Sequence, residues 1–202
     1  MKINLPNQLS IARCILAIIF VFFMSFTHWI PFAIAYIIFI IAAITDYWDG
    51  KIARQTKSIT KFGQLIDPIA DKVLMVAAFV MMMKLEELKI PGWCVVIIFA
   101  REFLVTGIRT LAAADGTIIP ADPWGKLKTV LQMTYVIAFL FLATARRFFL
   151  DVSFSFMPEN MIKLYDPLLG KTSLVFMMFI AIYTLYSGCE ILWKNWEKLK
   201  LD

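Results

Sequence analysis

The chain has 202 residues, of which 61% are hydrophobic and only 17% are charged, and its mean hydropathy is +0.77. This composition lies far outside that of a soluble domain of similar length and predicts a polytopic membrane protein. The net charge of +5 does not indicate nucleic-acid binding, because the basic residues cluster at the ends of apolar segments. There they suit anionic lipid headgroups or phosphorylated substrates.

Six apolar segments are long enough to cross the hydrocarbon core as helices, which takes about 20 residues at a rise of about 1.5 Å each. They lie approximately at residues 9–27, 30–50, 66–84, 91–111, 126–146 and 171–193. One long linker is expected at about 147–170, which contains Pro158 and Pro167. The sequence therefore predicts an all-α fold, a single membrane domain of residues 1–202 with six transmembrane helices.

Lysine and arginine residues are distributed unevenly between the two sides of the predicted bundle. The side that holds both termini carries about twice as many of them as the other side. Because the positive excess marks the cytoplasmic side of a membrane protein, both termini are expected in the cytoplasm.

Four aspartates lie at the cytoplasmic ends of the second and third predicted helices: Asp46, Asp49, Asp67 and Asp71. Residues three or four apart share a helix face, so each pair forms one stripe, and the antiparallel connection brings both stripes to the same depth. A carboxylate near hydrocarbon is costly unless it is paired or binds a cation. With no His or Cys nearby, these oxygens favour Mg²⁺ or Mn²⁺, and four carboxylates can hold two such ions.

Small and polar residues accompany the aspartates. Gly50 and Ala53 remove bulk from the same face, which either permits close helix packing or leaves room for a phosphate ligand. Arg54 and Thr60 add a cation and a hydroxyl, as a pyrophosphate bridged by divalent ions requires. Taken singly, a basic residue such as Arg54 is also explained as a topology signal.

A second basic group is expected near the cytoplasmic ends of the fourth and fifth predicted helices: Arg101, Arg109, Lys126 and Lys128. Positive-inside topology alone accounts for the two lysines. It accounts poorly for Arg101, which lies well inside an apolar segment beside Glu102. This group is a candidate site for an anionic co-substrate, apart from the aspartates.

The pattern Asp-x2-Asp-Gly-x2-Ala-Arg-x8-Gly-x3-Asp-x3-Asp starts at Asp46, and all eight fixed positions are present. Chance would produce it at about one start in ten billion. The pattern resembles the signature of the CDP-alcohol phosphotransferases, integral membrane enzymes that make phospholipids. The segments 5–13, 101–109 and 125–132 are similar to one subfamily, the phosphatidylglycerophosphate synthases.

The resemblance implies transfer of the phosphatidyl group of CDP-diacylglycerol to sn-glycerol 3-phosphate, with release of CMP. It implies two metal ions held by the aspartates, with Asp71 also deprotonating the incoming hydroxyl. The residues it suggests for CDP-diacylglycerol are Gly50, Arg54, Thr60, Asn7 and Ser10, and those expected at the glycerol 3-phosphate site are Arg101, Arg109 and Lys126. A homodimer among membrane lipids is expected, in a bacterial cytoplasmic membrane with the active site facing the cytoplasm.

Other readings stay open. A cardiolipin, phosphatidylserine or phosphatidylinositol phosphate synthase would share the aspartates and differ in its acceptor pocket. The basic group favours a phosphorylated acceptor, so serine fits less well. A cation or proton transporter is disfavoured, because all four acids lie at one membrane face and a transport site is expected near the midplane. A purely structural membrane protein is less favoured still.

Overall fold

The structure is a computed structural model that describes residues 5–56, 61–114, 123–152 and 159–195. Over these ranges the chain forms six α-helices, one short 3-10 helix and no strand, which confirms the all-α prediction. The elements are α1 (Leu5–Met24), α2 (Trp29–Thr56), α3 (Lys61–Met83), η1 (Glu86–Leu88), α4 (Gly92–Ala114), α5 (Pro123–Val152) and α6 (Glu159–Asn195). They follow the six predicted segments in order.

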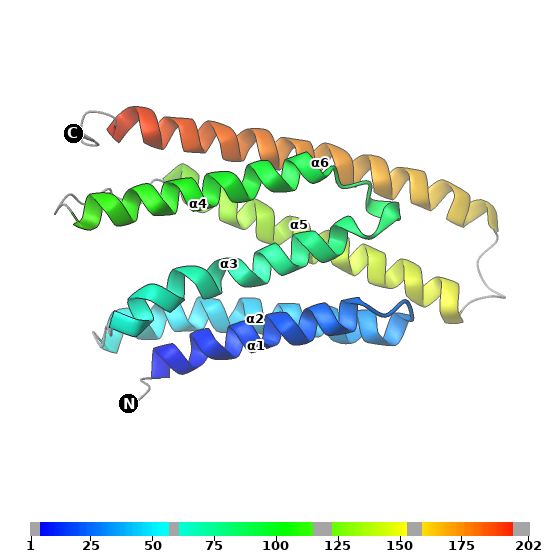
Figure 1. Ribbon diagram of the computed structural model, residues 1–202. Helices are drawn as coiled ribbons and strands as arrows, with labels where there is room; N and C mark the ends of the chain where they lie inside the picture. The colour runs from blue at the N-terminus through cyan, green and yellow to red at the C-terminus, as the bar shows by residue number, and fades with distance from the viewer. Residues whose placement is uncertain (1–4, 57–60, 115–122, 153–158, 196–202) are drawn as a thin grey trace.

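The helices lie roughly side by side in two groups joined by α5 (Figure 1). α1 packs against α2 and α3, while α4 and α5 pack against α6, and α5 also reaches α2. One end of the bundle holds the C-terminal ends of α2, α4 and α6 and the N-terminal ends of α1, α3 and α5. We call it the motif end, and we call the opposite end, where η1 lies, the η1 end.

The outer faces of the bundle are apolar. Large side chains such as Ile18, Val96 and Ile182 are exposed, which water disfavours and lipid accepts. Among the described residues, α5 over Gly125–Val152 and α6 over Leu164–Asn195 are long and apolar enough to cross a membrane. These features identify a membrane protein. Six transmembrane helices with cytoplasmic termini stay a prediction.

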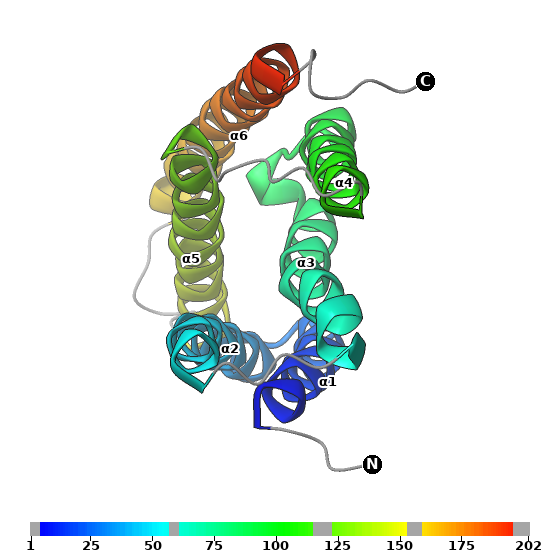
Figure 2. The same ribbon diagram turned by 90° about the vertical axis from the view of Figure 1, so that its left-hand side faces the viewer.

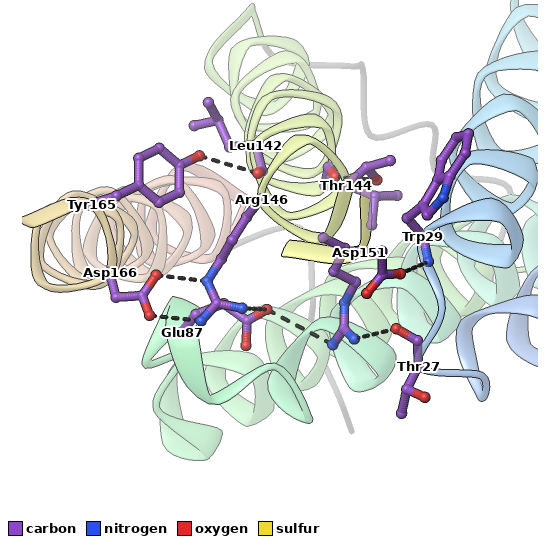
Figure 3. Close-up of polar contacts among 11 residues, drawn as sticks. Thr27, Trp29, Glu87, Leu142, Thr144, Arg146, Asp151, Tyr165 and Asp166 are labelled. Carbon is purple, nitrogen blue, oxygen red and sulfur yellow. Dashed lines mark hydrogen bonds and ion pairs between the residues drawn. The ribbon is translucent and has the colours of Figure 1, made fainter. Parts of the chain in front are cut away.

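Ion pairs between segments far apart in sequence close the η1 end (Figure 3). Arg146 of α5 donates from Nε and Nη2 to the two carboxylate oxygens of Asp166 in α6, at 2.6 Å each. Its neighbour Arg147 donates to the backbone carbonyl of Thr27 at 2.7 Å. The buried Oε1 of Glu87 in η1 lies 3.7 Å from Arg146 and 3.8 Å from Arg147. Four segments are thereby fastened together.

The predicted linker at 147–170 is wrong at both of its ends. α5 continues to Val152, and α6 begins at Glu159 and runs through Pro167. The charged residues that lower the hydropathy here are paired within the bundle, as in the contact between Arg146 and Asp166. Tyr165 also donates to the carbonyl of Leu142 at 3.1 Å, which holds the start of α6 against α5.

Candidate active site

The four aspartates lie in two neighbouring helices at the motif end (Figures 1 and 2). Asp46 and Asp49 belong to the C-terminal part of α2, and Asp67 and Asp71 belong to the N-terminal part of α3. α2 and α3 contact one another. Carboxylate donors from two adjoining helices fit a hard divalent cation. The side chains themselves lie outside the described residues, so the two-metal site stays a prediction.

The residues predicted to bind CDP-diacylglycerol are only partly described. Gly50 and Arg54 lie in α2, and Asn7 lies in the first turn of α1, but nothing is described of their side chains, and Thr60 falls outside the described ranges. Ser10 of α1 is buried, and so is Arg13 one turn further on. Arg13 ends the segment 5–13 that is similar to the subfamily, but no role was predicted for it, although its place one turn from Ser10 was a usable signal.

The second basic group surrounds a cavity of about 240 Å³ at the motif end. Its lining comes from α4 (Arg101, Glu102, Val105, Thr106, Arg109), from α5 (Gly125, Lys126, Lys128, Thr129) and from Ile191 of α6. The α4 residues recur at intervals of one, three and four, so they share one face of that helix. The structure thus brings together all three residues predicted for glycerol 3-phosphate.

Among the described residues that line this cavity, positive charge exceeds negative charge. Lys128 is only 6% exposed and forms an ion pair with Oε1 of Glu102. Nη1 of Arg101, which is also 6% exposed, lies 3.7 Å from that same oxygen. One carboxylate therefore serves two buried cations, while Arg109 and Lys126 add two further positive charges. Buried excess charge is costly, and a dianion such as a phosphate monoester would offset that cost.

The start of α5 reinforces this potential. Gly125 and Lys126 line the cavity from the first turn of the helix, where backbone N–H groups lack intrahelical partners and the helix dipole is positive. Helix N-termini bind phosphate groups for this reason. Together with the basic side chains, this end of α5 makes the cavity suited to an anionic ligand.

Lys72 is a described residue of α3 that approaches the basic cavity. It follows Asp71 in α3 and lies close enough to Lys128 for their charges to repel. α3 also contacts both α4 and α5. α3 therefore packs against two of the helices that line the basic cavity, and how near the aspartates lie to that cavity stays a prediction.

Residues of α6 were missed by the sequence analysis. Nη2 of Arg101 donates to Oγ of Ser187 at 2.7 Å, and the side-chain amide of Gln132 lies 3.5 Å from the hydroxyl of Thr184. The segment 171–193 was interpreted only as an apolar span. Thr184 and Ser187 are small polar residues three positions apart in this segment, and such residues form hydrogen bonds between membrane helices. Their spacing could have indicated the contacts.

The fold defines a helical membrane protein whose basic cavity would suit an anionic ligand, and comparisons with known proteins narrow the class. Residues 3–161 match the family model of the CDP-alcohol phosphatidyltransferases. The chain is 35% identical to the CDP-diacylglycerol--glycerol-3-phosphate 3-phosphatidyltransferase of Bacillus subtilis, over 98% of this chain and 97% of that protein. A protein of the same name from Rickettsia bellii is 38% identical, over 91% of this chain and 92% of its own length. The chain belongs to the CDP-alcohol phosphatidyltransferase family.

Proposed function

We propose that this protein transfers the phosphatidyl group of CDP-diacylglycerol to sn-glycerol 3-phosphate, giving phosphatidylglycerophosphate and CMP in phospholipid biosynthesis. The observation that carries the acceptor assignment is the cavity lined by Arg101, Arg109 and Lys126. Its excess of cations favours a phosphorylated alcohol over serine. The printed names of the full-length relatives from Bacillus subtilis and Rickettsia bellii support the same acceptor.

The proposed mechanism assigns a role to each group of side chains. Mg²⁺ or Mn²⁺ ions, held by Asp46, Asp49, Asp67 and Asp71, would neutralise charge on the pyrophosphate and on the departing CMP. Arg101, Arg109 and Lys126 hold the phosphate of the acceptor, which orients its free primary hydroxyl.

Asp71 takes the proton of that hydroxyl as its oxygen bonds to the phosphorus of the phosphatidyl group. The bond from this phosphorus to the bridging oxygen of the pyrophosphate breaks, and CMP leaves with that oxygen. Gly50, Arg54 and Thr60, with Asn7 and Ser10, contact the CDP moiety. The acyl chains stay among the membrane lipids throughout.

The same proposal places the motif end in the cytoplasm of a bacterial cell, as part of a homodimer in the cytoplasmic membrane. Supporting it, the motif end carries Arg13, Arg109 and Lys126 on its helices, and lysines and arginines are more frequent on the cytoplasmic side of membrane proteins. Active-site residues at that face would meet a soluble acceptor without its crossing the bilayer.

An acceptor screen tests the proposal. Purified protein is given CDP-diacylglycerol and Mg²⁺ with glycerol 3-phosphate, phosphatidylglycerol, serine or inositol phosphate, and CMP release and the lipid product are measured. Turnover is expected with glycerol 3-phosphate, is lost with a chelator, and returns with Mg²⁺ or Mn²⁺ but poorly with Ca²⁺, whose larger and looser coordination misplaces the phosphorus. Faster turnover with another acceptor, or full turnover in the chelator, would contradict the proposal.

A further inference from the structure

α6 forms a wall of the basic cavity, although it lies almost wholly beyond the part of the chain that matches the family model. That match covers residues 3–161, whereas α6 runs from Glu159 to Asn195. Ile191 of α6 lines the cavity directly. Ser187, four residues before Ile191, accepts a hydrogen bond from Arg101 of α4. The acceptor site is therefore built from three helices, of which the family match describes two.

The first contact holds the far end of the Arg101 side chain. Its Nη2 donates to Oγ of Ser187 at 2.7 Å, and Ser187 is fully buried while Arg101 is 6% exposed. A hydrogen bond from a guanidinium to a neutral hydroxyl is charge-assisted, so it orients the donor more firmly than a neutral pair would. Because Ser187 is fully buried, removing its hydroxyl takes away a partner that lies inside the contact between α4 and α6.

The second contact fixes the middle of the same side chain. A Cβ placed on Gly188 would lie 2.7 Å from Cγ of Arg101 and 3.2 Å from its Nε. Real Cβ atoms do not approach another carbon as closely as the first of these distances. Arg101 therefore runs directly over the backbone of α6, and any side chain at position 188 would push it away.

We propose that Ser187 and Gly188 are positioning residues that hold the Arg101 guanidinium toward the phosphate of the acceptor, so that α6 sets the affinity for the phosphorylated co-substrate. The inference rests on the proposed function and extends it to a helix outside the family match. Glu102 adds a third contact, since its carboxylate lies 3.7 Å from Nη1 of Arg101 and also pairs with Lys128. The Arg101 side chain is thus in contact with Ser187, Gly188 and Glu102.

A matched pair of serine variants tests this role. Ser173 is also fully buried in α6 and also forms a 2.7 Å hydrogen bond, to the hydroxyl of Tyr135, but it does not line the cavity. Ser187→Ala should raise the KM for glycerol 3-phosphate about 10-fold and leave the KM for CDP-diacylglycerol unchanged. Ser173→Ala should lower the Tm by about as much as Ser187→Ala does, because each loses one buried hydrogen bond, and it should leave both KM values unchanged. Ser187→Thr, which keeps the hydroxyl, should restore the affinity.

A matched pair of glycine variants tests the second contact. Gly107 lies in α4 between Arg101 and Arg109, and a Cβ there would meet nothing within 4 Å. Gly188→Ala should raise the KM for glycerol 3-phosphate by about 10-fold or more, because Arg101 must move. Gly107→Ala should leave it unchanged and should slightly raise the Tm, since alanine favours a helix.

Binding is also measured without turnover, as the rise in Tm that added glycerol 3-phosphate produces in each variant. This rise should be smaller in Ser187→Ala and Gly188→Ala than in wild type or in either control. Wild-type turnover with glycerol 3-phosphate decides the proposed function separately; if another phosphorylated acceptor is used, the same comparison is made with it. Unchanged acceptor affinity in Ser187→Ala and Gly188→Ala, or equal losses in the two serine variants, would overturn the role of α6.

Discussion

Two cavities of about 240 Å³ lie beside opposite ends of α5, and their linings differ in kind. The cavity at the η1 end touches Arg146, but its other lining residues are apolar or aromatic: Leu142, Ala145, Phe149, Leu150, Ile162 and Tyr165. There Arg146 is engaged by both carboxylate oxygens of Asp166. The cavity at the motif end has, among its described lining residues, four basic side chains and one carboxylate. An arginine in a membrane helix therefore says little by itself about binding.

The difference lies in how the charges are balanced. At the η1 end, Arg146 and Arg147 share Glu87, and each has a further oxygen partner of its own, from Asp166 or the Thr27 carbonyl. Such a network closes on itself and fastens the helices. At the motif end, the described residues that line the basic cavity include four basic side chains and one carboxylate, that of Glu102, so an anion would fit there. The first arrangement suits structure, and the second suits a substrate site.

Exchanging one aspartate at each end should separate the two roles most sharply. Asp67→Asn removes a predicted metal ligand and should lower turnover by more than about 100-fold without loss of folded protein. Asp166→Asn leaves Arg146 with a weaker partner and should lower the stability by about 2 kcal/mol while turnover persists. Turnover and thermal unfolding are measured on both variants. Substantial activity in Asp67→Asn would count against the metal site.

Arginine truncation should give the next largest contrast. Arg109→Ala should raise the KM for glycerol 3-phosphate about 10-fold, the scale of a charge-assisted hydrogen bond, and change the KM for CDP-diacylglycerol far less. Arg147→Ala loses the Thr27 carbonyl and the Phe32 ring, whose centroid lies 4.0 Å from the guanidinium carbon. It should lower the Tm and spare both KM values. If Arg109→Ala altered only the CDP-diacylglycerol constant, the two substrate pockets would be reversed.

The exposed lysines should give the smallest effect. Lys126 lies at the rim of the basic cavity and is exposed, so Lys126→Ala should raise the KM for glycerol 3-phosphate only about 3-fold, as expected for a solvated charge. The difference from wild type should shrink as salt is added. Lys84→Ala, which removes an exposed lysine at the η1 end, serves as the control. A salt-independent effect at Lys126 would show that this lysine is desolvated in the complex.

The helices were predictable because hydrophobic length dominates a membrane sequence. The six segments appear in order, and Arg101 was selected because a charge inside an apolar run requires a partner. The extensions of α5 and α6 were missed, since charged residues such as Arg146 and Asp166 lower the hydropathy of a segment without opposing helix formation. Their pairing across helices cannot be read from either helix alone.

The contribution of α6 was hidden for a related reason. Ser187 and Gly188 are ordinary in an apolar helix, where small residues generally serve packing. Only the path of the Arg101 side chain gives them a role, and that path depends on how α4 crosses α6. The aspartate motif, by contrast, could be recognised without the structure, since its spacing alone indicated the family. The family match confirmed that inference, and the positions of its carboxylates stay a prediction.

The two charged ends of α5 also make this helix sensitive to the thickness of its membrane. Lys128 and Arg146 lie 18 residues apart on one continuous helix, a span of about 27 Å at the α-helical rise. This is close to the roughly 30 Å of a typical hydrocarbon core. A much thicker or thinner bilayer would force α5 to tilt or shift, and either movement would strain the contact of Lys128 with Glu102 or of Arg146 with Asp166. We therefore expect lipid chain length to alter the shape of the basic cavity through the helix that joins both ends.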